Sequence, residues 1–139
     1  MFSTKNRALF LQDQDLRGRL YAYLAGGLQR CQCEPILING TPDHLHVLFY
    51  LNRTHSIAQL VAEIKSSSAK WLKNQGAVYH EFAWQSGYGV FSVSQSQVGA
   101  VHDYVADQEE HHRSRSFQDE FRLLCEKHGL AIDERYAWQ

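Results

Sequence analysis

Apolar residues recur along the chain with two distinct periods, and these periods predict its helices and strands. Apolar residues spaced three and four apart predict four helices, over residues 13–30, 56–73, 96–111 and 116–128. Runs rich in aliphatic and aromatic residues predict three strands, over residues 34–39, 44–51 and 82–94. The turn sequence Gly-Thr-Pro-Asp separates the first two strands and predicts an antiparallel hairpin. This order of elements predicts an α+β fold, an antiparallel β-sheet with helices packed on it.

The second predicted strand carries two histidines inside an otherwise apolar run. His44 and His46 are separated by one residue, and Leu48 and Tyr50 continue the same face. Side chains of a strand alternate between its two faces, so both imidazoles leave the sheet on one side. Their Cα atoms are expected to lie about 7 Å apart, which lets two ring nitrogens reach one metal ion. A His-x-His pair in a strand is also compatible with incidental packing.

The third predicted helix places a tyrosine and a carboxamide on one flank. Its apolar side consists of Val98, Val101 and Val105. At about 100° per residue, Tyr104 and Gln108 lie one turn apart on a different flank, at the border between core and solvent. We interpret this flank as the edge of a pocket, although a tyrosine at such a place is usually a packing residue.

Together these side chains offer the parts of a metal-assisted reaction of tyrosine. His44 and His46 supply two nitrogen ligands, and Gln108 adds an oxygen. A free tyrosine has a pKa near 10, so only about 0.1% of it is phenolate at neutral pH. A divalent ion that polarises a phosphate oxygen compensates for this weak nucleophile. Histidines alone suit zinc, whereas nitrogen and amide oxygen ligands with open positions also suit Mg²⁺ or Mn²⁺.

Composition narrows the class of protein. The 139 residues fit one domain, residues 1–139, and the formal charge of −1 means that any site for a polyanion must be local. No apolar run approaches the roughly 20 residues of a membrane span, and the first residues do not have the order of a secretory signal. Three cysteines, an odd number, are predicted to be reduced packing residues. We therefore expect a cytoplasmic protein without a membrane partner.

Longer stretches of the sequence resemble one family of DNA-processing enzymes. PDHLHVL, YVADQEEHHRSRSFQDEF and CEKHGLAIDERYAW are similar to the single-tyrosine transposases of small bacterial insertion sequences, and equally to their domesticated relatives associated with repetitive extragenic palindromes. Both groups belong to the HUH superfamily, named for a His–hydrophobe–His motif. FSTKNR, CEPILINGTPDHLHVLFYL, SIAQLVAEIKSSSAKWL and FAWQSGYGVFSVSQSQ also resemble this family in order, so the resemblance covers essentially the whole chain.

The resemblance implies roles for four residues. His44 and His46 match the metal-binding histidines, Gln108 the third ligand of Mg²⁺ or Mn²⁺, and Tyr104 the nucleophile. The implied reaction cuts single-stranded DNA, leaves a 5′-phosphotyrosine link and a free 3′-hydroxyl, and rejoins strands by reversal. The implied partners are hairpin DNA ends and a second copy of the chain, with the tyrosine helix of one subunit completing the site of the other in a bacterial cytoplasm.

The resemblance also implies a ferredoxin-like (RRM-like) sheet whose first strand precedes Phe2. Because the sequence starts at Met1, we expect most of that strand to be truncated, with an apolar sheet edge left open. A catalytically silent or domesticated protein that binds single-stranded DNA hairpins is therefore the main alternative.

Two other enzyme classes use related chemistry. A histidine-triad nucleotide hydrolase needs a third histidine two residues after His46, where this chain has Leu48. A rolling-circle replication initiator or relaxase has the same chemistry on chains that are usually longer.

Overall fold

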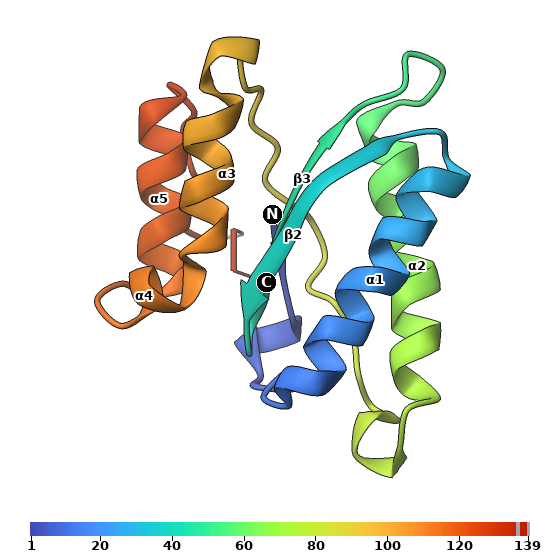
Figure 1. Cartoon of the computed structure of the whole chain (residues 1–139). Coiled ribbons are helices and arrows are strands. Elements are labelled where there is room, and N and C mark those ends of the chain that lie inside the picture. Colours follow the sequence, from blue (N-terminus) through green and yellow to red (C-terminus); the bar gives the residue numbers. More distant parts are fainter. Residues whose placement is uncertain (136, 139) are drawn as a thin grey trace.

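A short three-stranded antiparallel sheet stands between two layers of helices (Figure 1). The computed structural model describes residues 1–135 and 137–138. The strands are β1 (Phe2–Ser3), β2 (Glu34–Thr41) and β3 (His44–Tyr50), in the spatial order β1-β3-β2. One side of the sheet is covered by α1 (Gln14–Arg30) and α2 (Ile57–Lys73). The other side is covered by α3 (Val98–Ala106), α4 (Gln108–His112) and α5 (Phe117–Lys127). The predicted α+β class is confirmed.

Helices α1 and α2 form because each combines an apolar stripe with a capped start. Asp13 caps α1 by accepting hydrogen bonds from the backbone of Asp15 and Leu16, and Ser56 forms a capping box with Gln59 at the start of α2. The stripe of α1 is fully buried and consists of Leu16, Leu20, Leu24 and Leu28. It packs with Leu60, Ile64 and Leu72 of α2 and with Leu45 of β3 into one core, which holds this layer against the sheet.

The predicted hairpin is confirmed, and its register sets the positions of the histidines. Thr41 pairs with His44 and Asn39 with His46. The turn is tight because Gly40 has no side chain: a Cβ there would collide with the carbonyl oxygen of His44. The backbone of His44 is thereby fixed close to the end of β2.

The strand predicted over residues 82–94 is wrong. This segment lies along the N-terminal residues, and backbone hydrogen bonds run from Lys5 to Ala83 (2.9 Å), from Gln85 to Ser3 of β1 (2.8 Å) and from Gly89 to Met1 (2.8 Å). It forms only one isolated bridge, between Thr4 and Trp84. Gly87 has φ +86°, which turns the chain out of the extended conformation that a continuous strand requires.

The helix predicted over residues 96–111 is interrupted. A 3₁₀ turn, η3 (Gln95–Gln97), precedes α3, and the chain leaves helical geometry at Asp107, with φ −96° and ψ 26°. Asn39 of β2 explains the break, because its Nδ2 donates to the carbonyl oxygens of Val105 (2.9 Å) and Ala106 (3.1 Å) at the end of α3. Tyr104 and Gln108 therefore belong to different helices.

One edge of β3 is only partly paired. β1 pairs with it through Phe2–Leu45 and Ser3–His44, and in the described part of the chain no strand continues this pairing along residues 46–50. A cavity of about 750 Å³ follows this edge between α2 on one side and α3 and α5 on the other.

Candidate metal and tyrosine site

His44 and His46 project from β3 toward the layer of α3, α4 and α5. Their ring centroids lie 5.4 Å apart, His44 is inaccessible to solvent and His46 is 7% exposed. The sequence prediction that both imidazoles share one face is consistent with this geometry. Two imidazoles buried on the covered face of a sheet need polar partners. The hairpin turn and the helices α4 and α5 supply them.

Asp43 and Thr41 orient the ring of His44. Nδ1 of His44 lies 2.7 Å from Oδ1 of Asp43 and 2.9 Å from Oγ1 of Thr41. Burial opposes ionisation of Asp43, but hydrogen bonds from His44 and Thr41 outweigh it and lower the pKa of this carboxyl. An ionised carboxylate only accepts, so the ring donates from Nδ1 and directs Nε2 away from Asp43. This is the arrangement by which a second-layer carboxylate prepares a histidine for a metal ion.

Gln108 faces Nε2 of His44. Its Nε2 donates to the carbonyl oxygen of Tyr104 at 3.4 Å, which directs Oε1 toward Nε2 of His44 at 3.3 Å. Either a proton on Nε2 or a cation bound by both atoms accounts for this contact. The structure therefore brings together His44 and Gln108, two of the three predicted ligands, in a geometry that suits a metal ion, even though the predicted continuous helix is broken.

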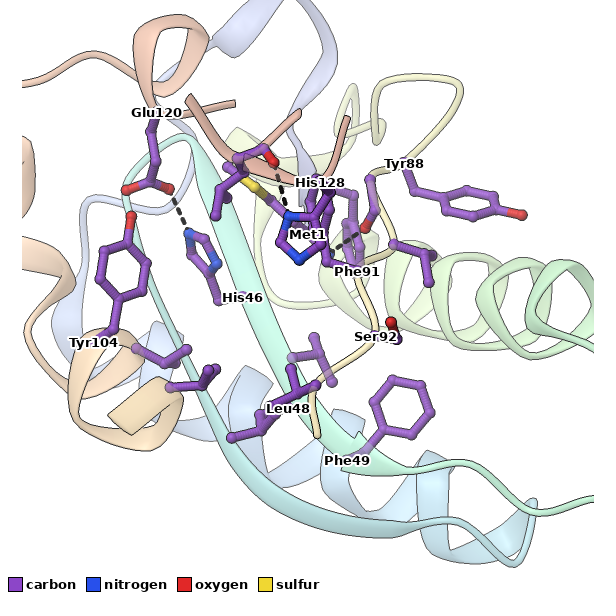
Figure 2. A pocket seen from close by; sticks show the side chains of 18 of the residues that line it. Met1, His46, Leu48, Phe49, Tyr88, Phe91, Ser92, Tyr104, Glu120 and His128 are labelled. Carbon is purple, nitrogen blue, oxygen red and sulfur yellow. Dashed lines mark hydrogen bonds and ion pairs between the residues drawn. The ribbon is translucent and has the colours of Figure 1, made fainter. Parts of the chain in front are cut away.

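Tyr104 lies beside His46 at the end of α3. The two ring centroids are 6.0 Å apart, and the other face of the tyrosine stacks on His111 at 4.5 Å. Its hydroxyl points toward Glu120 (Figure 2). Burial, and then the neighbouring Glu120 carboxylate, raise the pKa of this phenol well above its usual value. Tyr104 is thus protonated at neutral pH and needs a nearby cation to react as a nucleophile.

Two residues that the sequence analysis missed lie at the centre of this group. Glu120, in the first turn of α5, is inaccessible to solvent, and its Oε1 is 2.6 Å from Nε2 of His46 and 3.7 Å from Nε2 of His44. Its Oε2 lies 3.4 Å from Nε2 of His112, on α4. A signal for Glu120 exists in the sequence, because it occupies a position of the apolar stripe that includes Phe117 and Phe121.

The charges of the site follow from these contacts. Burial alone would raise the pKa of Glu120, but the imidazoles of His112 and His46 hold it far below its usual range. Burial lowers the pKa of His46 to about 4, and the Glu120 carboxylate opposes this only in part. At neutral pH the site therefore contains an ionised Glu120 beside a neutral His46, which is the protonation state that metal ligands require.

The cavity along the edge of β3 opens onto this group. His46, Tyr104 and Glu120 line it, and the rest of its wall is largely apolar, with Phe49, Val61 and Val101 among the lining residues. Two cationic side chains, Arg115 and Lys127, also line it. The cavity therefore joins the candidate ligands and the tyrosine to a space large enough for part of a polymeric substrate.

Each predicted site residue thus has a defined place in the structure. His44, His46, Gln108 and Tyr104 lie together in one patch of a single chain. The resemblance instead implies that the tyrosine helix is exchanged between subunits, whereas here Tyr104 lies beside His46 of its own chain. None of the helices in the described part of the chain is both long and apolar enough to cross a bilayer.

Comparison with known proteins identifies the family. The model of the family "Transposase IS200 like" matches residues 1–108. A crystal structure from Deinococcus radiodurans R1, assigned as a transposase, shares the fold, with a TM-score of 0.59 and 20% sequence identity over 77% of this chain and 85% of that chain. No curated protein matches the sequence. Because the family model spans well over half of the sequence, the chain belongs to the IS200-like transposase family.

Proposed function

We propose that this transposase cuts and rejoins single-stranded DNA through a covalent link between a 5′-phosphate and Tyr104. In this proposal a divalent ion, Mg²⁺ or Mn²⁺, is held by His44, His46 and Gln108. The substrate would be a DNA end that folds into a hairpin. The physiological unit would be a homodimer.

The convergence of four side chains from distant parts of the sequence carries the proposal. The hairpin brings His44 and His46, and the segment around Asp107 brings Tyr104 and Gln108, so that His44 and Gln108 lie 3.3 Å apart and the rings of His46 and Tyr104 lie 6.0 Å apart. Packing alone does not require a buried carboxamide oxygen, an imidazole and a tyrosine from separate elements to meet in one place. A metal-assisted reaction of the tyrosine accounts for this convergence.

The chemistry balances with the residues present. The Tyr104 oxygen attacks the phosphorus of one phosphodiester, a bond forms between this oxygen and phosphorus, and the bond from phosphorus to the 3′-oxygen breaks. The phenol proton is lost to the surroundings, and the departing 3′-oxygen takes up a proton to become a hydroxyl. When bound, the divalent ion supplies charge neutralisation at the phosphate. Rejoining is the same displacement in reverse, with a 3′-hydroxyl as the nucleophile.

Single-stranded DNA fits the wall of the cavity. Tyr88 and Phe91 supply aromatic faces on which bases can stack, and Arg115 and Lys127 supply positive charge for phosphates. These local cations matter because the chain as a whole has a formal charge of −1. Their arrangement beside Tyr104 supports a polynucleotide substrate.

A homodimer is supported by apolar side chains at the rim of the same edge. Tyr50, Leu51, Tyr88 and Val90 are each more than 40% exposed. Tyr50 ends β3 and Leu51 follows it, whereas Tyr88 and Val90 belong to the segment that lies along β1. A second copy would cover them, and we expect a dimer in sedimentation at tens of micromolar. A clean monomer would contradict the dimer without affecting the assignment of Tyr104.

A denaturing-gel assay for a protein–DNA adduct tests the reaction. The purified chain is mixed with labelled single-stranded DNA that carries the hairpin end adjoining its own gene, with Mn²⁺. The wild type is expected to form an adduct and Tyr104→Phe none, because only the reacting oxygen has been removed. Tyr88→Phe is the matched control, since it changes another tyrosine of the same cavity, and it should retain the adduct. An adduct that persists in Tyr104→Phe would show that another residue is the nucleophile.

A DNA-binding protein without cleavage activity is the second candidate. The observation that favours it is the Glu120 carboxylate beside the Tyr104 hydroxyl, which places negative charge where a phosphate must approach. The same gel distinguishes the two candidates. Hairpin binding with bound metal and no adduct from the wild type would favour the binding protein.

A further inference from the structure

Glu120 and His112 form a second set of buried polar atoms that the four expected site residues do not explain. The carboxylate of Glu120 lies between three imidazoles: Oε1 is 2.6 Å from His46 and 3.7 Å from His44, and Oε2 is 3.4 Å from His112. The rings of His44 and His112 are also in contact, with centroids 4.3 Å apart. One carboxylate therefore contacts histidines from both β3 and α4.

Two atoms in this cluster lack hydrogen-bond partners. Oε2 of Glu120 and Nε2 of His112 are buried, and neither has a hydrogen bond among the described residues, because their mutual geometry does not meet that of a hydrogen bond. Leaving a buried polar atom without a partner is unfavourable, and more so when the group is charged. The two atoms lie 3.4 Å from each other.

The spacing of these atoms is close to that of ligands around one ion. Candidate ligand atoms of His44, His112 and Glu120 all lie within 4.8 Å of one another. Nitrogen and oxygen ligands at about 2.0–2.2 Å from one ion lie roughly 3–4 Å apart. The 2.6 Å contact between His46 and Glu120 is shorter, so these two side chains would separate by a few tenths of an ångström to admit a cation.

The chemistry of the cluster also favours a cation. The Glu120 carboxyl group lies 2.6 Å from His46, and the Asp43 carboxyl group lies 2.7 Å from His44. Carboxylate oxygens and imidazole nitrogens are ligands that divalent metal ions take in proteins.

We propose that Glu120 and His112 are additional ligands of the metal ion, so that α4 and α5 contribute to the coordination sphere with His44 and His46. This inference rests on the proposed function, in which the two strand histidines bind the ion. It assigns a metal role to α5, which lies beyond the 1–108 region matched by the family model. A set of several imidazoles and one carboxylate suits Mn²⁺ or Zn²⁺ better than Mg²⁺, which prefers oxygen ligands and retains water.

Calorimetric titration of the full chain with Mn²⁺ alone tests the proposal without measuring activity. Glu120→Gln preserves size and one acceptor oxygen but removes the charge, and we expect it to weaken Mn²⁺ binding about 10–100-fold. His112→Gln removes a ligand at a less buried position and should weaken binding about tenfold. Glu126→Gln, an exposed carboxylate on the same helix, and His80→Gln, an exposed histidine, are matched controls that should bind as the wild type does.

The outcomes separate this inference from the proposed function. Binding that is lost in His44→Ala but unchanged in both Glu120→Gln and His112→Gln would overturn this inference and leave the proposed site intact. An absence of Mn²⁺ binding by the wild type would overturn both. If circular dichroism shows that Glu120→Gln does not fold, His112→Gln decides: weakened binding supports the inference, and wild-type affinity contradicts it.

Discussion

Nε2 of His46 lies 2.6 Å from Oε1 of Glu120, although 74 residues separate them along the chain. This contact joins the hairpin to the C-terminal helix α5 and ties the position of α5 to the candidate metal site. The two residues also respond to pH in the same direction, because burial keeps His46 neutral and the surrounding imidazoles keep Glu120 ionised.

The first prediction concerns stability against pH in the absence of metal. The pKa of His46 falls from 6.5 in the unfolded chain to about 4 in the folded one, so the unfolded chain binds the extra proton between these values. The free energy of unfolding should therefore be highest above pH 6.5 and fall by about 3 kcal/mol as the pH drops toward 4. The lowered pKa of Glu120 adds a further loss below about pH 4.5, its ordinary value.

Urea unfolding in EDTA at several pH values measures this effect. His46→Gln should flatten the dependence between pH 6.5 and 4, whereas His80→Gln, at an exposed position, should not. A wild-type stability that stays constant over this range would show that His46 is not held neutral.

The second prediction concerns the carboxylate behind His44. Asp43→Asn should weaken Mn²⁺ binding about 10–100-fold, because the ring loses the acceptor that fixes its orientation and its tautomer. Asp103→Asn is a matched control: Asp103 also lies next to a histidine, His102, at 3.2 Å, but this pair is exposed. Calorimetry that gives both variants the affinity of the wild type would exclude a role for Asp43 in positioning the ring.

The third prediction concerns the hairpin turn that holds the histidines. Gly40→Ala should destabilise the fold by about 1–3 kcal/mol, since the new methyl group collides with the carbonyl oxygen of His44 and with Leu45. Gly18→Ala, on α1, meets no atom within 4 Å and should stabilise the helix slightly. Equal unfolding midpoints for the two variants would mean that the turn relaxes freely.

The accuracy of the sequence predictions depends on whether local or distant residues decide each feature. The helices at 14–30 and 57–73 and the hairpin were predictable because their apolar periods, caps and turn residues all lie within the element itself. The helix break at Asp107 was not predictable, because it depends on Asn39, which is almost 70 residues away. The side chain of Asn39 donates hydrogen bonds to the last carbonyl oxygens of α3. The segment 82–94 has strand composition, but Gly87 turns it away after one bridge.

The residues of the candidate site also fall into those that local sequence patterns predict and those that only tertiary packing brings together. The His-x-His pair and the spacing of Tyr104 and Gln108 are local patterns, and they pointed to residues that the structure places together. Glu120 and His112 contact the histidines only through tertiary packing. The sequence does contain one local signal for Glu120, which is a carboxylate within the apolar stripe of α5. An acidic residue at such a position indicates a buried polar site.

The last prediction asks whether one chain supplies a complete site. Tyr104 lies beside His46 of its own chain, with ring centroids 6.0 Å apart, so a dimer with this arrangement contains two independent sites. Tyr104→Phe and a His44→Ala/His46→Ala variant should each be inactive, and a mixture of the two should also form no adduct with labelled DNA. If the tyrosine helix is instead exchanged between subunits, one site of a mixed dimer combines an intact Tyr104 with intact histidines, and the mixture forms an adduct. A tagged copy of each variant, purified by both tags in turn, ensures that mixed dimers are present. Adduct formation by that doubly purified material would therefore contradict the arrangement within one chain while supporting both the nucleophile and the dimer.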